Sequence, residues 1–164
     1  MLHKPQPSSQ ARLIKIDLDE SSIGSNSPEV EHERKVAIFD LLEENVFELV
    51  AGPAGPYKLA IAIAEHRLAF AITAGDSDEP NATFLLSLNP FRKVVKDYFL
   101  ICESYFEAIK SAPPSKIEAL DMTRRSLHDE GSTLVMERLE GKIRMNEATS
   151  RRLFTLLCAL HWKG

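Results

Sequence analysis

Three cations stand at the start of one amphipathic segment. Residues 89–109 have the periodicity of a helix, and its first two turns carry Arg92, Lys93 and Lys96. The N-terminal end of a helix bears about half a positive charge and several unpaired N–H groups, so acidic side chains usually occupy it. Cations there favour an anion site for a phosphate or a carboxylate. The alternative is that Asp97, an acid on another element or solvent balances their charge.

A second group of polar residues lies on a later predicted helix. Asp121 is four residues before Arg125, which is four residues before Asp129, so ordinary surface ion pairs explain most of the group. Because histidine titrates near neutral pH, His128 beside Asp121 is the candidate general acid or base of an enzyme. No nucleophile accompanies it. Arg124 and Arg125 are also candidate ligand-binding residues.

The sequence predicts no metal site and no cofactor. Glu29 and His32 have the Glu-x-x-His spacing of carboxylate-bridged metal bundles, but only one copy is present. The histidines show no paired spacing of four residues. No glycine-rich phosphate loop is present, so a nucleoside triphosphate is not predicted.

Charge is spread unevenly along the chain. Residues 1–91 contain 7 Lys and Arg against 14 Asp and Glu, whereas residues 92–164 contain 13 against 10. The two halves either complement each other within one fold or give a basic face for an anionic partner. Arg151 and Arg152 could join such a basic face, and the anionic partner would then be nucleic acid. Nucleic-acid binding ranks last, because exposed cations are not interleaved with aromatic residues and the pI is about 5.8.

Local signals predict the first elements. Alternation at Ile14, Ile16 and Leu18 indicates a half-buried strand. Ser27 as N-cap followed by Pro28 begins a helix that runs to about residue 44, with Phe39 widening its apolar face.

Two alternating runs, residues 57–63 and 67–73, predict a hairpin with one bulky apolar face and one alanine face. Small side chains allow close approach by a helix of the same chain or by a second subunit, which would give a homo-oligomer. We expect the intramolecular cover, since a near-continuous apolar strand is buried on both faces. Residues 82–87 predict a third strand.

Helices follow. Asn89 is the predicted cap of the cation-bearing helix, and Ser115 that of the next one, which we expect Gly131 to kink or divide. Residues 142–145 are a short extended piece, and Asn146 caps a last helix. The cation-bearing helix is the expected spine of the core, through an apolar stripe made of Phe91, Val94, Val95, Tyr98, Phe99, Cys102, Tyr105, Phe106 and Ile109.

Length and composition are those of one ordinary domain. The chain has 164 residues, of which 44% are hydrophobic and 27% charged. We expect residues 1–10 to be a flexible tail and residues 11–164 to be a single α+β domain. The start lacks a signal-peptide core, and no apolar run approaches the about 20 residues that span a bilayer, so no membrane role is predicted. Cys102 and Cys158 are expected to be small buried hydrophobes in a reducing cytoplasm.

The chain also resembles a known group. The likeness spans about residue 12 to the end and runs through residues 31–41, 89–105, 117–122, 127–128, 130–132, 151–155 and 161–162. On these segments the sequence is similar to an alphaproteobacterial family catalogued only as an uncharacterised protein family (UPF). The resemblance implies a bacterial cytoplasmic protein and brings no activity or site residues.

Together these observations predict an α+β fold in which a small antiparallel sheet packs against the long central helix and C-terminal helices. As function we favour a non-enzymatic binding or regulatory protein that recognises a small anionic ligand or a partner protein. The alternative is a small enzyme acting on a phosphorylated or carboxylated metabolite, with Arg92, Lys93 and Lys96 as the anion clamp and His128 as acid or base. A pocket shared by His128 and the start of the central helix would favour the enzyme.

Overall fold

The computed structural model describes residues 10–162, so nearly all of the expected tail lies outside the described residues. Its helices and strands follow the order β1 (Leu13–Leu18), α1 (Glu20–Ile23), α2 (Pro28–Glu43), β2 (Phe47–Leu49), β3 (Tyr57–Ala64), β4 (Arg67–Ala74), β5 (Ala82–Ser87), α3 (Asn89–Ser111), α4 (Pro114–Leu139), β6 (Ile143–Met145) and α5 (Glu147–Ala159). The fold is α+β, as the sequence predicts.

The main sheet has the strand order β1-β3-β4-β5. The predicted hairpin is β3 and β4, and β5 extends it antiparallel. β1 instead pairs parallel to β3, so the sheet is mixed rather than antiparallel. Parallel neighbours need a crossover, which the segment through α1, α2 and β2 provides. β2 and β6 form a separate antiparallel pair.

One side chain of β1 points the other way from its prediction. The pairing register with β3 shifts between Leu13 and Lys15, which leaves Ile14 42% exposed. An irregularity of this kind breaks the alternation of faces on which the prediction rested. Leu13 fills the core in place of Ile14, next to Ile16, which is buried as predicted.

The alanine face of the hairpin is not covered by a layer of helices, so the expected intramolecular cover is wrong. Ala60 is exposed, and Ala62, Ala69 and Ala71 are half-buried. On the same face, Leu85 of β5 is 53% exposed. The helices lie against the opposite, bulky face, whose larger side chains bury more apolar area.

The spine of the core is α5 rather than α3. α5 packs against α2 on one side and α4 on another. Eight of its 13 residues are buried, among them Leu153, Phe154, Leu156, Leu157, Cys158 and Ala159. Cys158 of α5 is a buried free thiol, as predicted, whereas the free thiol of Cys102 is only half-buried. Burial raises the pKa of both thiols, most strongly that of Cys158.

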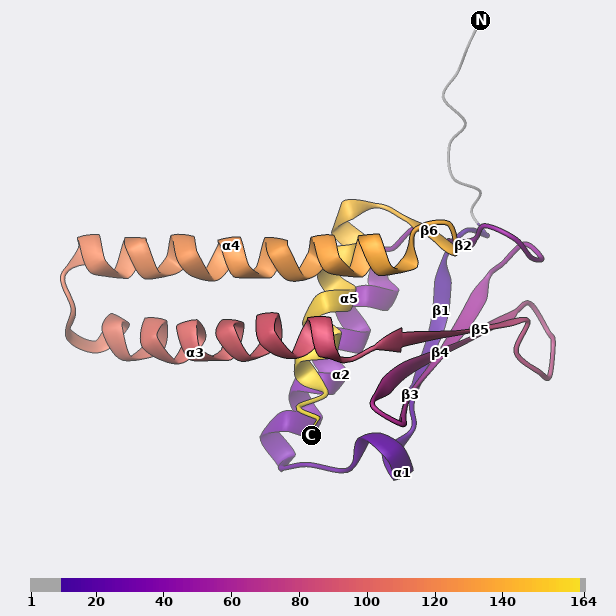
Figure 1. Ribbon diagram of the computed structural model, residues 1–164, viewed down its shortest axis with the longest axis horizontal. Coiled ribbons are helices and arrows are strands. Elements are labelled where there is room, and N and C mark those ends of the chain that lie inside the picture. The colour runs from indigo at the N-terminus through magenta and orange to yellow at the C-terminus, as the bar shows by residue number, and fades with distance from the viewer. Residues whose placement is uncertain (1–9, 163–164) are drawn as a thin grey trace, which may run out of the picture.

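Helix α3 leaves the core after its first turns and pairs with α4 in a long projecting arm (Figure 1). Phe91, Val94 and Val95 are buried at its base, whereas Phe106 is 61% and Ile109 50% exposed. The predicted stripe is therefore continuous in sequence but only partly buried. Within residues 10–162, the structure has no helix that is long and apolar enough to cross a membrane.

Two of the predicted helix caps are wrong and two are confirmed. Ser27 and Asn146 accept hydrogen bonds from the backbone N–H groups of Val30 and Thr149. Asn89, however, lies inside α3, because the buried Leu88 takes the capping position. The predicted capping box at Ser115 is absent, since α4 already begins at Pro114 after Pro113. Proline suits a first helical turn because it has no N–H to satisfy.

Gly131 neither kinks nor divides α4, which runs unbroken from Pro114 to Leu139. A Cβ built on Gly131 would lie 2.2 Å from the ring of Phe154 in α5. The glycine therefore allows α4 and α5 to approach closely, and the ring occupies the space that a side chain would fill.

The buried side of α2 is narrow and includes a charge. Arg34, Ala37 and Leu41 face the core, whereas Phe39, predicted to widen this side, is 67% exposed. Arg34 is only 4% exposed. Its guanidinium donates to the carbonyls of Ala159 and Leu160 at the end of α5 and of Gly24 after α1, and it pairs with Glu31 at 3.1 Å. One side chain thus joins three segments.

Replacement of Arg34 by methionine should lower the free energy of unfolding by about 3 kcal/mol or more, because several buried carbonyls lose their donor. Urea denaturation checks this. Arg138→Met, at an exposed position of α4, is the matched control. Equal midpoints for the two variants would contradict the structural role of Arg34.

Gly131→Ala should destabilise the protein by about 1–3 kcal/mol, although alanine is the better helix former by about 1 kcal/mol. The added methyl has no room beside Phe154. Thermal unfolding measures the effect, with exposed Ser126→Ala on the same helix as the control. A rise in melting temperature for Gly131→Ala would show that α4 and α5 are not this close.

Candidate functional site

Two of the three predicted cations come together on one side of α3. Arg92 and Lys96 are one turn apart and line a cleft of about 380 Å³. The cleft runs along the side of the helix rather than over its N-terminal end. Its walls are Arg92, Val95, Lys96, Phe99, Leu100, Glu103, His161 and Trp162.

The second wall of the cleft comes from the residues after α5. The His161 ring stacks on Phe99, with ring centroids 4.8 Å apart and planes at 12°. Its Nε2 lies 3.0 Å from Oε2 of Glu33 on α2. His161 has φ 47°, a left-handed conformation that is unfavourable for a residue other than glycine. The stacking and the contact with Glu33 hold His161, and with it Trp162, beside α3.

The cations of the cleft lack acidic partners. Arg92 Nη2 lies 3.4 Å from Nδ1 of His66, and its buried Nε has no hydrogen-bond partner in the described part of the chain. A buried unpaired donor is costly, by about 1–3 kcal/mol. Neither Lys96 nor Glu103 forms an ion pair with any other described residue. An anion at the Arg92 end would satisfy both cations.

Lys93 lies apart from this cleft. It lines a separate depression between α3 and α4, together with Glu130 and Glu137. Two carboxylates of α4 thus line the same depression, but neither forms an ion pair with Lys93 in the described part of the chain. Of the three cations at the helix start, the structure assigns only Arg92 and Lys96 to one surface.

Arg124 and Arg125 both bind Asp121 on the arm. The Asp121 carboxylate accepts from Nε of Arg124 at 3.2 Å and pairs with Nε of Arg125 at 3.1 Å. The hydrogen bond from Arg124, with a smaller contribution from Arg125, lowers the pKa of Asp121. The Arg124 guanidinium also lies 4.7 Å from the centre of the Tyr105 ring. These groups satisfy each other and do not line the cleft.

His128 belongs neither to the cleft along α3 nor to the ion-pair cluster around Asp121. Its Nε2 is 2.8 Å from the hydroxyl of Thr155 on α5, and its ring packs edge-on against Tyr98 and Phe154. Burial, and next the positive charge of Arg151, lowers the pKa of His128 below its usual 6.5. Asp121 is not among the contacts of His128. The predicted pair between Arg125 and Asp129 is also absent, because Asp129 pairs with Arg151 instead. His128 does not line the cleft at the start of α3.

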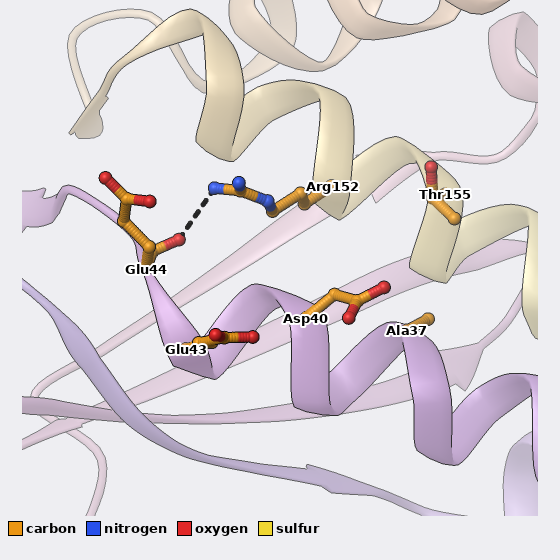
Figure 2. A pocket seen from close by; sticks show the side chains of 6 residues that line it. All are labelled: Ala37, Asp40, Glu43, Glu44, Arg152 and Thr155. Atoms are coloured by element: carbon orange, nitrogen blue, oxygen red, sulfur yellow. Dashed lines mark hydrogen bonds between the residues drawn. The ribbon is translucent and has the colours of Figure 1, made fainter.

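A further pocket, which the sequence reasoning missed, lies between α2 and α5 (Figure 2). Asp40 and Glu43 stand on one side and Arg152 and Thr155 on the other. The Arg152 guanidinium donates to the backbone carbonyl of Glu44 at 2.9 Å. The one cation that lines this pocket, Arg152, is thus already hydrogen-bonded. Within residues 10–162, no cluster of His, Cys, Asp and Glu side chains is arranged to hold a metal ion.

The wall formed by His161 and Trp162 was also missed. The one local signal was the chain's single tryptophan, next to a histidine and after the last predicted helix. Its distance in sequence from α3 gave no indication that the two segments meet. Contact between them depends on how α5 ends.

Comparison with known proteins gives a consistent result. The model of the uncharacterised protein family UPF0262 matches residues 10–163. A UPF0262 protein of Rhizobium meliloti is 58% identical over 93% of this chain and 96% of its own length. A UPF0262 protein of Nitrobacter hamburgensis is 54% identical over 98% of this chain and 97% of its own length. One of Brucella anthropi is 58% identical over 94% of this chain and 96% of its own length. No solved structure matches. The resemblance found in the sequence is thereby confirmed.

The lowered pKa of His128 predicts a pH dependence of stability. The unfolded chain takes up a proton on this residue near pH 6.5, whereas the folded protein does so only at lower pH. Stability is therefore lost as the pH falls below about 6.5. Urea denaturation at a series of pH values should show a smaller loss in His128→Gln than in the wild type. His32→Gln, at an exposed position, is the control, and an unchanged slope in His128→Gln would contradict the assignment.

Proposed function

Because this chain belongs to the uncharacterised protein family UPF0262, we propose a function from its own surfaces: it is a binding protein whose cleft along α3 takes an amphipathic anion. The ligand class is a small molecule with a carboxylate or phosphate group on an apolar body. The unmet positive charge of Arg92 and Lys96 beside an apolar cleft is the observation that carries the proposal.

The lining of the cleft supports an apolar ligand body. Val95, Phe99, Leu100 and Trp162 supply its apolar surface. Ligand sites in proteins are mostly apolar, with a small number of polar groups that fix orientation, and have volumes of about 300–1,000 Å³. A cleft of about 380 Å³ lies at the small end of that range and suits a short chain or a single ring system.

Charge within the cleft supports one ligand orientation. Arg92 and Lys96 lie toward the base of α3, and Glu103 lies two turns farther along the helix. An anionic head group is attracted to the base and repelled from the Glu103 end. A charge-assisted hydrogen bond to the free Nε–H of Arg92 would also remove the cost of that buried donor.

We propose binding without catalysis. The described residues that line the cleft include no serine, threonine, cysteine or lysine–histidine pair in hydrogen-bond contact, and His161 already contacts Glu33. His128, the candidate acid or base, bonds to Thr155 elsewhere. A ligand-dependent regulatory role in the cytoplasm is compatible with such a site.

The test uses Trp162, the single tryptophan of the chain, as a reporter inside the cleft. Titration with octanoate or octyl phosphate should change its fluorescence in a saturable way and raise the melting temperature. Octanol, which has the same chain without the charge, should bind more weakly. Arg92→Gln/Lys96→Gln should weaken binding of the two anions by about tenfold or more.

Lys93→Gln is the matched control, since it removes a cation from the same helical turn outside the cleft. It should leave both fluorescence titrations unchanged. The proposal fails if neither anion alters the fluorescence of Trp162 below its micelle-forming concentration. It also fails if Lys93→Gln weakens binding as much as the double variant does.

A further inference from the structure

The outward side of α3 carries an ordered pattern of charge that extends beyond the cleft. We define the α3 stripe as six residues of that helix: Arg92, Lys96, Phe99, Leu100, Glu103 and Glu107. At about 100° of rotation per residue they fall within a band about 100° wide. Two cations lie at the base, two apolar side chains in the middle and two carboxylates toward the tip of the arm.

The stripe is open to contact. α3 packs on α4 through its opposite side, and the two helices project together from the body of the protein (Figure 1). Lys96, Glu103 and Glu107 are exposed, and Leu100 is 53% exposed. Arg92 and Phe99 are half-buried, and one face of the Phe99 ring is covered by His161. An apolar pair at the centre of an accessible helix face is typical of a surface that meets another protein.

The pattern is symmetric about the midpoint between Phe99 and Leu100. Arg92 and Glu107 are equally far from that point, and so are Lys96 and Glu103. When such a helix is laid antiparallel on a copy of itself, each cation therefore meets a carboxylate. Parallel pairing would oppose like charges instead, which is unfavourable.

We propose that two copies of this chain associate through their α3 stripes, antiparallel about a twofold axis that passes between Phe99 and Leu100. Arg92 of one copy pairs with Glu107 of the second, Lys96 pairs with Glu103, and the four central apolar side chains pack together. This is an isologous interface, in which one surface serves both partners.

The charges of the stripe have few partners within one chain. Lys96 and Glu103 form no ion pair with another described residue, and Arg92 contacts only His66 through its charged group. Glu107 pairs with Lys110 at 3.1 Å, but both side chains are largely exposed, so that pair contributes little. A second copy supplies what is missing.

This pairing covers the cleft, so a bound anion and a second copy exclude each other. The inference does not depend on the proposed ligand. It shares Arg92 and Lys96 with the ligand site, but it rests on the symmetric pattern that they form with Glu103 and Glu107. The two proposals also have separate readouts: ligand binding is measured by fluorescence of Trp162 at low protein concentration, and association by sedimentation without ligand.

The test reverses charges in pairs. Sedimentation velocity should show a concentration-dependent dimer for the wild type, weakened by added salt. Glu103→Lys/Glu107→Lys makes the stripe wholly basic, and Arg92→Glu/Lys96→Glu makes it wholly acidic. Each variant should dimerise at least about tenfold more weakly by itself, since every ion pair becomes a repulsion.

Restoration makes the test specific. An equimolar mixture of the two variants should form a heterodimer, and the variant with all four reversals should again dimerise with itself. Lys116→Glu/Glu118→Lys, which reverses two exposed charges on α4, should associate as the wild type does.

The proposal is overturned if the wild type stays monomeric at several hundred micromolar, roughly the weakest range of specific association. It is equally overturned if the mixture stays monomeric, or if all variants dimerise alike. Circular dichroism of each variant verifies that it is folded. Because the mixture and the fourfold variant should regain association, loss of folding cannot imitate the expected result.

Discussion

The body of the protein depends on the buried guanidinium of Arg34. The last carbonyls of α5 have no partner within their own helix, and they lie in the interior, where water cannot satisfy them. Arg34 supplies donors to two of these carbonyls and to Gly24. A cation is also favourable at the negative end of a helix dipole. α2, α5 and the turn after α1 are thus joined at one point.

The candidate site is built outward from that point. Glu33 precedes Arg34 on α2, and its carboxylate contacts His161, the second residue after α5 ends. His161 in turn stacks on Phe99 of α3. Adjacent residues of α2 therefore fix the end of α5 and direct the following chain against the arm. The cleft exists because the arm leaves the body beside this end.

How much the sequence reveals depends on how local each signal is. The hairpin of β3 and β4 and the caps at Ser27 and Asn146 follow from neighbouring residues, and they were predicted correctly. Arg92 and Lys96 were also proposed as site residues from their position next to one another on one helix, and that role stays a prediction. The parallel pairing of β1, the role of Gly131 and the burial of Arg34 depend on residues far away in sequence. Apolar periodicity also could not separate the buried base of α3 from its exposed end, because a stripe looks alike whether or not a partner covers it.

The central position of α5 has a consequence for synthesis of the protein. Every other helix and strand leaves the ribosome before α5, yet α2 packs mainly on that helix and α4 packs on it as well as on α3. Until it emerges, the nascent chain can form the hairpin of β3 and β4 and the two-helix arm, whose contacts are between elements adjacent in sequence. The surfaces of α2 and α4 that contact α5 stay uncovered until α5 has been synthesised. The body is therefore completed late, and a chain interrupted before residue 147 would present apolar surface that chaperones and proteases recognise.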